Sequence, residues 1–494
     1  MSLITISDLT FAYPGSYDNI FEHVSLELDS RWRLGLIGRN GTGKTTLFRL
    51  LMGEFPYSGT IAAKAVFSYF PYTVENPEAA AGDAAAAICP QSDPWQLSRE
   101  LNLLQVPEDV LERPYSTLSS GEQVKLLLAA LFLREDSFLL IDEPTNHLDQ
   151  AARSVIADYL RRKSGFILVS HDRTLLDRCT DHILSLNRAD ITLQKGNFSV
   201  WQAGKEARDQ AELARNERLK KEVRRLQDAA RQAAQWSDRT ERTKKGSRIA
   251  GLRPDRGAIG HKAAKMMKRS KGIEARREAA LEEKAGLLKN VESAPELKLS
   301  PLAYPQSRLA ELRGVSICYS GPTVCRDVTF SIDRGDRICL SGRNGSGKSS
   351  VLKLLLGQDI PHSGMVTRGS QLKISYVPQD AGFLAGPLRD FIRESGTDES
   401  LMKAVLRKLG FSRLQFEKDL SDYSAGQKKK VLLASSLCQQ AHLYIWDEPL
   451  NYIDILSRIQ IEDLLTAFPP TLIFVEHDPC FQQKIATQVV TLED

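Results

Sequence analysis

Residues 38–45 read GRNGTGKT and directly follow an apolar stretch, residues 33–37. This pattern predicts a strand, a glycine loop and the start of a helix. The glycines of such a loop let backbone N–H groups converge on phosphate oxygens, and the start of the helix adds a favourable dipole. Lys44 would reach the β- and γ-phosphates of a nucleotide, and the Thr45 hydroxyl would bind Mg²⁺. The stretch therefore predicts an α/β domain that binds ATP with Mg²⁺.

Three further motifs of the first half fit such a domain. Residues 118–122 (LSSGE) precede a strongly helical run. The buried strand expected at 138–141 ends at Asp142 and Glu143, where the first carboxylate can hold Mg²⁺ and the second can act as general base for the attacking water. Another buried strand ends beside His171, at the ligand edge of a parallel sheet. Taken alone, His171 would more often be structural, so the ordered set of motifs carries the prediction of ATP hydrolysis.

The same motifs recur in the second half of the chain. A glycine loop, a serine-glycine element, an acidic strand end and a histidine strand end stand at residues 342–349 (GRNGSGKS), 423–427 (YSAGQ), 447–448 (DE) and 476–478 (EHD). Lys348 follows Lys44 by 304 residues, and His477 follows His171 by 306. Motifs that keep register this closely over such a distance indicate an internal duplication. We therefore expect two tandem P-loop NTPase domains of the α/β class.

The composition predicts a soluble protein of two or three domains. Of its 494 residues, 42% are hydrophobic and 26% are charged, which is ordinary for a globular protein. No run approaches the length of a membrane span, and the first residues alternate like a strand and not like a secretory signal. The seven cysteines are scattered, which favours reduced thiols and a cytoplasmic location over a disulfide framework or a zinc site.

The segment between the two domains concentrates the positive charge. Residues 205–289 contain 25 Lys and Arg against 13 Asp and Glu, a net charge of +12. The whole chain nets +4 (66 − 62), so the remainder nets −8 (41 − 49). A charge run is usually only the solvated face of a helix, but this asymmetry favours contact with an anionic partner.

We expect this segment to form an antiparallel helical hairpin. Apolar residues at coiled-coil spacing form a seam, with Leu219, Val223, Leu226, Ala230 and Ala233 on one arm and Leu281, Ala285 and Leu288 on the other. Glycines break the helices between residues 237 and 272. Arms of about 30 residues would reach roughly 45 Å. The tip holds basic residues that we expect to contact the phosphates of folded RNA, namely Lys244, Lys245, Arg248, Arg253, Arg256, Lys262 and Lys265.

The paired motifs resemble those of the ATP-binding cassette (ABC) superfamily. In that family's terms each half has a Walker A loop, a signature motif, a Walker B strand and a switch histidine. The resemblance implies that Glu143 and Glu448 are catalytic bases and that His171 and His477 are the switch histidines of the same catalytic centres.

The resemblance also implies which residues bind the nucleotide and the metal. ATP contacts are expected from Tyr13, Gly38, Asn40, Gly41, Gly43, Lys44, Thr45, Thr46, Ser119 and Gly121, and from Tyr319, Gly342, Asn344, Gly345, Gly347, Lys348, Ser349, Ser350, Gln379, Ser424 and Gly426. Mg²⁺ is expected at Thr45, Asp142, Ser349, Gln379 and Asp447. Tyr13 and Tyr319 match the aromatic residue that stacks on adenine, although packing at a strand end is a plainer role for each.

In this family each ATP site is shared between two cassettes. The resemblance implies one site with Lys44 and Glu143 opposite Ser424 and Gly426, and another with Lys348 and Glu448 opposite Ser119 and Gly121. Nucleotide binding would then close the cassettes on each other.

Two cassettes on one chain, without a membrane span, resemble the ABC-F subfamily, whose members act on ribosomes with the linker against tRNA and ribosomal RNA at the tRNA exit site. The stretches at 423–430 (YSAGQKKK) and 446–454 (WDEPLNYID) are similar to those of the Lsa-type antibiotic-resistance members, while the first half has the commoner TNHLD at 145–149. Those members counter lincosamides, pleuromutilins and streptogramin A, which bind at the peptidyl transferase centre. The resemblance implies a ribosome-protecting ATPase.

We expect the first cassette at residues 1–202, the linker at 203–293 and the second cassette at 294–494. The protein is expected to be a monomer whose cassettes close within one chain. The alternatives are a translation factor without a resistance role and, less favoured, the ATPase of a transporter with a separate membrane subunit. A DNA-repair ATPase is weaker still because zinc motifs and long coiled coils are missing, so no DNA partner is expected.

One position departs from the family pattern. Gln379 matches the glutamine that contacts Mg²⁺ and the attacking water, but the first half has Tyr72 at this place. A phenol has one polar atom, so it cannot supply the paired acceptor oxygen and donor nitrogen of an amide. We therefore expect two unequal ATP sites, with the weaker metal contact in the site built on Lys44.

Overall fold

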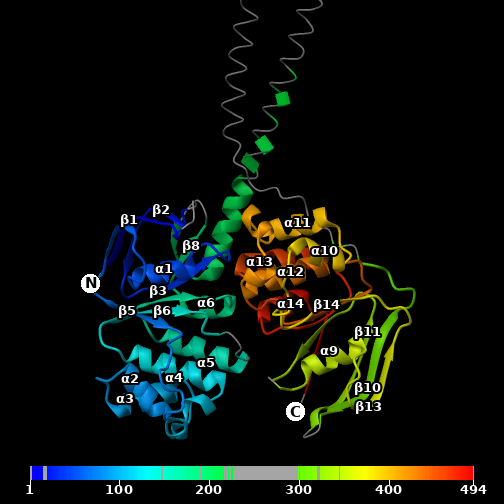
Figure 1. Ribbon diagram of the computed structural model, residues 1–494, viewed down its shortest axis with the longest axis horizontal. Coiled ribbons are helices and arrows are strands. Elements are labelled where there is room, and N and C mark those ends of the chain that lie inside the picture. Colours follow the sequence, from blue (N-terminus) through cyan, green and yellow to red (C-terminus); the bar gives the residue numbers. More distant parts are fainter. Residues whose placement is uncertain are drawn as a thin grey trace, which may run out of the picture. The chain divides into compact units, whose positions relative to one another are not determined.

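The computed structural model of the protein describes residues 3–14, 19–145, 148, 150–187, 191–212, 299, 301–319, 323–343 and 345–492, together with 214–215, 217–218, 221, 224–225 and 228. The chain forms two compact units, residues 1–201 with 297–494 and residues 202–296. The first unit contains both cassettes (Figure 1). In the second unit, residues 202–212 are helical. The predicted apolar seam and all seven basic residues of the tip lie outside the described residues.

The first cassette is built on a six-stranded sheet of order β5-β6-β7-β3-β8-β9, in which only β9 is antiparallel to its neighbour. A three-stranded antiparallel sheet of order β2-β1-β4 accompanies it. The strands are β1 (Leu3–Phe11), β2 (Phe21–Asp29), β3 (Arg33–Gly38), β4 (Ser58–Ala62), β5 (Val66–Phe70), β6 (Ser137–Asp142), β7 (Phe166–Val169), β8 (His182–Leu186) and β9 (Ile191–Lys195). The helices are α1 (Lys44–Leu51), α2 (Ala81–Ile88), α3 (Pro94–Leu103), α4 (Ser120–Phe132), α5 (Gln150–Arg161) and α6 (Arg173–Cys179).

The second cassette repeats this plan with a five-stranded parallel sheet of order β14-β15-β16-β12-β17 and an antiparallel sheet of order β11-β10-β13. The strands are β10 (Arg308–Cys318), β11 (Thr323–Asp333), β12 (Arg337–Ser341), β13 (His362–Arg368), β14 (Ile374–Val377), β15 (Leu443–Asp447), β16 (Leu472–Val475) and β17 (Gln488–Thr491). The helices are α9 (Lys348–Leu356), α10 (Leu388–Glu394), α11 (Glu399–Lys408), α12 (Ala425–Cys438), α13 (Ile455–Ala467) and α14 (Pro479–Ile485).

Both faces of each parallel sheet are buried, which explains why these strands read as continuous apolar runs. In β6, Phe138 and Leu140 pack with α1 and the antiparallel sheet. Leu139 and Ile141 pack on the opposite face, in the cluster that contains α2, α4 and α5. Because the sheet is covered on both sides, the carboxyl ends of its strands are the edge at which polar side chains can meet a ligand.

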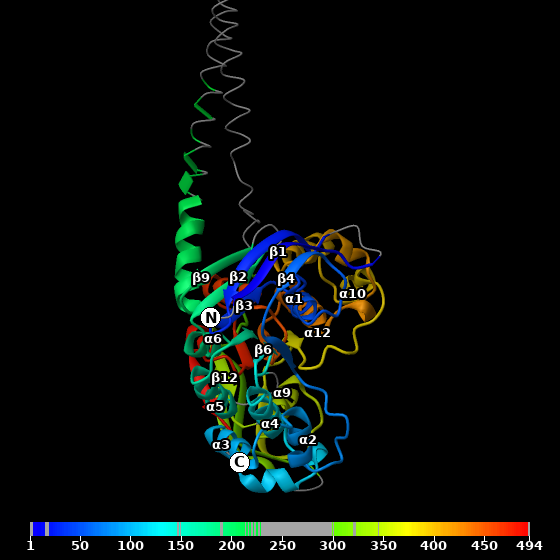
Figure 2. The same ribbon diagram turned by 90° about the vertical axis from the view of Figure 1, so that its left-hand side faces the viewer.

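A helical layer lies next to strand β6 of the first cassette. Helix α4 lies between β6 and the pair α2 and α3, as both side views show (Figures 1 and 2). The helix begins with a capping box in which Ser119 accepts from the backbone of Glu122 and the Glu122 side chain accepts from the backbone of Ser119. The sequence element 118–122 is therefore the start of a helix, as predicted.

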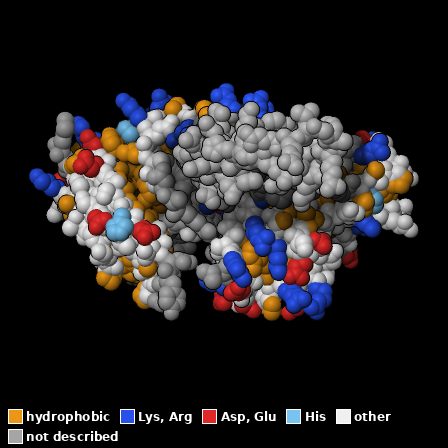
Figure 3. Space-filling model, turned by 90° about the horizontal axis from the view of Figure 1, so that it is seen from above, with side chains coloured by type: hydrophobic (Ala, Val, Ile, Leu, Met, Phe, Trp, Pro, Cys, Tyr) orange, Lys and Arg blue, Asp and Glu red, His pale blue; other side chains and the backbone are white. Residues whose placement is uncertain are grey.

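The surface carries mixed charge. On the face that Figure 3 shows, Lys and Arg side chains lie beside Asp and Glu side chains, with apolar groups between them. Within the described part of the chain, no helix is both long enough and apolar enough to cross a bilayer.

Candidate nucleotide-binding sites

Each predicted phosphate-binding loop joins a parallel strand to a helix. The first loop connects β3 to α1, and the second connects β12 to α9. Gly43 and Gly347 are the N-cap residues, with φ of 97° and 84° and no side-chain cap. The left-handed backbone at these positions favours glycine. The first backbone N–H groups of both helices consequently face the loop, where they can bind phosphate oxygens.

The lysine of each loop lies against its own backbone. Lys44 Nζ donates to the carbonyls of Gly38 and Arg39 at 2.8 and 3.1 Å. Lys348 Nζ donates to the equivalent carbonyls of Gly342 and Arg343 at 2.8 and 2.6 Å. The two halves therefore hold the ammonium group in the same way. Gly41 and Gly345 lie in these loops with positive φ, and Asn344 lies outside the described residues.

The hydroxyl and carboxylate expected at the metal meet in both halves. Thr45 Oγ1 donates to Asp142 Oδ2 at 2.9 Å, and the Tyr69 hydroxyl donates to the same oxygen at 3.2 Å. In the second half Ser349 lies beside Asp447, whose buried Oδ1 has no hydrogen-bond partner among the described residues. Burial raises the pKa of both aspartates.

Such a donor set fits Mg²⁺, which takes oxygen ligands and is usually held by one or two carboxylates together with substrate phosphates and water. It does not resemble a closed metal cage, because the described residues hold no cluster of three or more His, Cys, Asp or Glu that could bind an ion.

The glutamate and histidine of each half lie at neighbouring strand ends. His171 Nε2 is 3.3 Å from Glu143 Oε1, and His477 Nε2 is 3.7 Å from Glu448 Oε1. Glu143 and Glu448 both have positive φ, 51° and 45°. Non-glycine residues in this region are strained, and such strain is often found at functional sites. The duplication thus preserves an unusual backbone conformation as well as the residue types.

The surroundings of the two glutamates differ. Burial and the neighbouring Asp142 raise the pKa of Glu143 to about 7, although Lys44 opposes the shift. Burial also acts on Glu448, but the neighbouring His477 and Gln379 side chains and the charge of Lys429 outweigh it and lower the pKa of Glu448 to about 2. The two predicted sites are therefore electrostatically unequal.

Tyr72 has a different environment from Gln379. Its ring packs against the apolar core of the first cassette, whereas the Gln379 side chain lies beside Glu448 and helps to lower its pKa. The expectation of a weaker metal contact at the first site stays a prediction.

The two predicted adenine-stacking tyrosines contact their loops in the same manner. The Tyr13 hydroxyl is 3.0 Å from Thr46 Oγ1, and the Tyr319 hydroxyl is 2.9 Å from Ser350 Oγ. Both side chains are more than a third exposed. The Tyr13 ring also makes an edge contact with Phe11 at 5.1 Å, so the structure contains both the exposed ring that stacking needs and the strand-end packing of the plainer interpretation.

Residues of the second cassette lie against the first phosphate-binding loop. Asn40 Nδ2 donates to the Tyr452 carbonyl at 2.8 Å, and Asn40 N is 3.3 Å from Asp454 Oδ2. A Cβ atom added to Gly426 would lie 2.7 Å from Asn40 Nδ2 and 2.4 Å from the Tyr452 carbonyl oxygen. Only glycine fits between these atoms. The structure therefore brings Gly426, next to the helix cap Ser424, to the loop that carries Lys44.

The opposite pairing, of Lys348 and Glu448 with Ser119 and Gly121, stays a prediction. Ser119 and Gly121 are placed at the start of α4, where a Cβ on Gly121 would meet, among the residues that the structure describes, only Leu148 at 3.7 Å.

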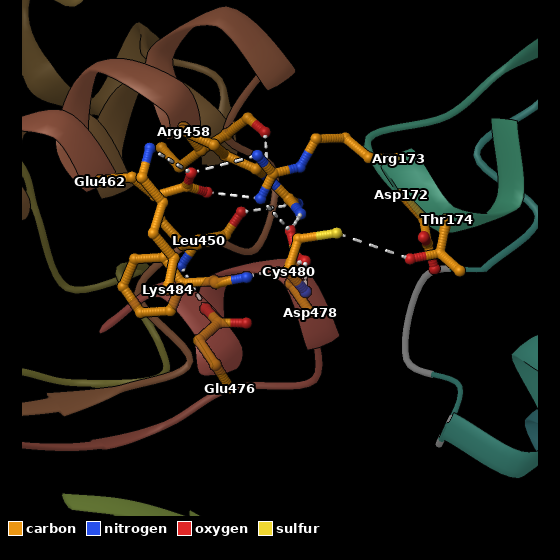
Figure 4. Close-up of polar contacts among 12 residues, drawn as sticks. Asp172, Arg173, Thr174, Leu450, Arg458, Glu462, Glu476, Asp478, Cys480 and Lys484 are labelled. Carbon is orange, nitrogen blue, oxygen red and sulfur yellow. Dashed lines mark hydrogen bonds and ion pairs between the residues drawn. The ribbon is translucent and has the colours of Figure 1, made fainter. Parts of the chain in front are cut away.

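A buried ion cluster joins the cassettes at another point (Figure 4). Arg173, at the start of α6, makes two parallel hydrogen bonds to the Glu462 carboxylate and a 3.2 Å contact with Asp478 Oδ2. Arg458 also approaches Asp478 Oδ2, at 3.4 Å. The side chains of Arg173, Glu462 and Asp478 are 8% exposed or less, so the charges depend on one another for their compensation.

Sequence reasoning did not find this cluster. Arg153 and Asp172 of the first cassette pair as Arg458 and Asp478 do in the second, so those positions repeat. The positions equivalent to Glu462 and Arg173 do not repeat, because they hold Ala157 and Pro479. The signal in the sequence is that a charged residue in one half corresponds to an uncharged residue at the same position of the other half.

Two phosphate-binding loops, each with an acidic strand end and a partner histidine, define a tandem ATP-binding cassette protein. The family model described as ABC transporter matches residues 21–146 and 325–451. The chain belongs to this family and is an ATPase.

Individual relatives within this family indicate which of its subfamilies the chain resembles. The chain is 28% identical to the ribosome protection protein VmlR of Bacillus subtilis, over 100% of this chain and 87% of that protein. It is 25% identical to the energy-dependent translational throttle protein EttA of Haemophilus influenzae, over 96% of this chain and 89% of that protein. The resemblance to ABC-F proteins is thereby confirmed.

The fold is also similar to that of a solved structure. The archaeal ribosome recycling factor aABCE1, in complex with the stalk protein aP1, matches with a TM-score of 0.63 and 18% identity over 99% of this chain and 87% of that chain.

The ion cluster generates a prediction about stability. Arg173→Ala leaves Glu462 and Asp478 buried without their main cation, so it should destabilise the joined cassettes by about 3 kcal/mol. The midpoint of thermal unfolding measures the loss. Arg178→Ala is the control on the same helix, since its pair with Asp158 is exposed and worth about 1 kcal/mol at most. Equal midpoints for the two variants would contradict a stabilising role for the cluster.

Proposed function

We propose that the protein is an ABC-F ATPase that binds the ribosome near the tRNA exit site. By inserting its linker there, it would protect the peptidyl transferase centre from lincosamide, pleuromutilin and streptogramin A antibiotics. The observation that carries the proposal is the similarity along the whole chain to a protein named for ribosome protection. The contact of Asn40 with the second cassette supports it, because an ATP site shared between cassettes can turn nucleotide binding into closure.

In this proposal ATP closes the cassettes and hydrolysis opens them. Lys44 and Lys348 hold the phosphates. Thr45 with Asp142, and Ser349 with Asp447 and Gln379, would hold Mg²⁺, which would supply positive charge against the phosphates. Glu143 and Glu448 accept a proton from the attacking water, while His171 and His477 hold these glutamates at the ends of neighbouring strands.

The linker is the part proposed to touch RNA. Residues 205–289 carry a net charge of +12, against −8 on the rest of the chain, and a basic surface attracts phosphates with a strong dependence on salt. The residues proposed for RNA contact at the tip are Lys244, Lys245, Arg248, Arg253, Arg256, Lys262 and Lys265.

A translation factor without a resistance role is the second candidate. The similarity to the translational throttle protein EttA favours it. Both candidates bind ribosomes, so drug resistance distinguishes them. Co-purification with a membrane protein in place of ribosomes would instead favour a transporter ATPase.

The proposed bases predict the behaviour of the double variant Glu143→Gln with Glu448→Gln. The amide keeps the shape of the side chain but cannot accept the proton, so hydrolysis should fall by about 100-fold or more while ATP binding persists. The variant should then sediment with ribosomes when ATP is present. Glu135→Gln, an exposed site in the same cassette, is the control. Normal hydrolysis by the double variant would show that the bases are assigned wrongly.

The resistance role predicts a change in drug sensitivity. Expression of the full chain in a sensitive bacterium should raise the inhibitory concentrations of lincomycin and tiamulin. The variant with Lys244, Lys245 and Arg248 all changed to Ala should lose this protection and keep its ATPase activity, because the cassettes are unaltered. Ribosome binding without any change in drug sensitivity would favour the translation factor.

A further inference from the structure

A buried lysine on helix α12 contacts the metal end of the second cassette. Lys429 is 2% exposed. Its Nζ donates to the carbonyl oxygens of Pro378, Gln379 and Asp447 at 2.7, 2.9 and 3.2 Å. A lysine ammonium has three N–H donors, so each donor has an acceptor here. Because a buried ammonium is costly without such partners, these three carbonyls and the helix are held in a fixed relation.

The three carbonyls belong to the segments that present the proposed catalytic side chains. Pro378 and Gln379 follow β14, and the Gln379 side chain lies beside Glu448. Asp447 is the last residue of β15 and lies beside Ser349. Lys429 therefore fixes the backbone of the residues proposed to meet Mg²⁺ and the attacking water.

The first turn of the same helix lies at the other ATP site. Gly426 faces Asn40 of the first phosphate-binding loop. Lys430 Nζ is 2.6 Å from Asp454 Oδ2, and that oxygen is 3.3 Å from the backbone N of Asn40. Lys429 and Lys430 are consecutive, so one turn of α12 contacts the surroundings of both sites. A shift of this turn at the first site must move Lys429 at the second.

The first cassette differs at this position. At an offset of 305 residues, Lys430 corresponds to Lys125, but Lys429 corresponds to Val124. Val124 packs against the apolar core of the first cassette. At the position that corresponds to Gln379, that cassette has Tyr72. The buried Lys429 and the glutamine Gln379 thus occur in the same half of the chain.

We propose that Lys429 is a positioning residue that couples the two ATP sites. Through α12, the state of the first site sets how firmly Gln379 and the end of β15 are held at the second site. The rate at the second site would therefore depend on the state of the first site. The first cassette has Val124 in place of this lysine. This inference rests on the proposed roles of Gln379 and Glu448. Coupling between the sites is measured as the change in rate at one site when the other site is altered.

The first experiment measures the chemical step at the second site alone. In full-length protein carrying Glu143→Gln, single-turnover hydrolysis reports the site of Glu448. Lys429→Val should slow this step by about 10- to 100-fold, as expected for a misplaced catalytic group. The ATP concentration for half-maximal rate should change by no more than about twofold, because Lys348 and its loop hold the phosphates. In protein carrying Glu448→Gln, the same substitution should leave the first-site rate within about twofold.

The second experiment tests the coupling. Lys44→Ala removes the lysine proposed to hold ATP at the first site, and the second-site rate is compared with and without it. In protein with Lys429 the rate should change by about fivefold or more, whereas with Lys429→Val this effect should disappear. Lys428→Met, at the preceding position of α12, is the control and should behave like the unaltered chain. Lys429→Met, which keeps the length of the side chain, replaces Lys429→Val if that variant does not fold.

The outcomes separate the inference from the proposed function. If Lys44→Ala has the same effect with and without Lys429→Val, the coupling role is wrong. If Glu448→Gln, added to Glu143→Gln, leaves the single-turnover rate intact, the proposed base is wrong, whatever Lys429 does. A proportional loss of ATP affinity and rate in Lys429→Val would show a general structural role and would also overturn the inference.

Discussion

The contact of Arg173 with Glu462 and Asp478 is the interaction on which the joined cassettes depend. Three charges from α6, α13 and the start of α14 are buried together. Removal of Arg173 would leave Glu462 and Asp478 with only their contacts to Lys484 and Arg458, both at 3.4 Å, in a medium that solvates them poorly. The cluster thus joins the two cassettes, and the contact of Asn40 with the Tyr452 carbonyl joins them at another point, although both contacts link segments hundreds of residues apart in the sequence.

The chemistry follows from the two-sided burial of the parallel sheets. Because α1 and the antiparallel sheet cover one face and the helical layer covers the other, the strand ends are the open edge. Asp142, Glu143 and His171 come together at this edge, as do Asp447, Glu448 and His477. The positive φ of both glutamates shows that the edge is held under the same local constraint in each half.

The strands, the phosphate-binding loops and the acidic strand ends could be predicted because each is specified by a short local pattern. The start of α4 at Ser119 is one example, since its capping box is visible in the sequence. The role of Lys429 could not be predicted, because a lysine in a helix is ordinarily exposed and its three acceptors come from two other segments. Arg173 was missed for the same reason, as its partners lie 289 and 305 residues away. The hairpin remains a prediction from spacing and charge.

The central claim is that ATP-driven closure delivers the basic linker to ribosomal RNA. Electron cryomicroscopy of ribosomes purified with the Glu143→Gln, Glu448→Gln protein tests it most directly, since blocked hydrolysis should hold the closed state on its target. We predict density for two closed cassettes at the tRNA exit site, with residues 237–272 directed toward the peptidyl transferase centre. Density at a different site, or a linker tip that contacts no RNA, would contradict the account.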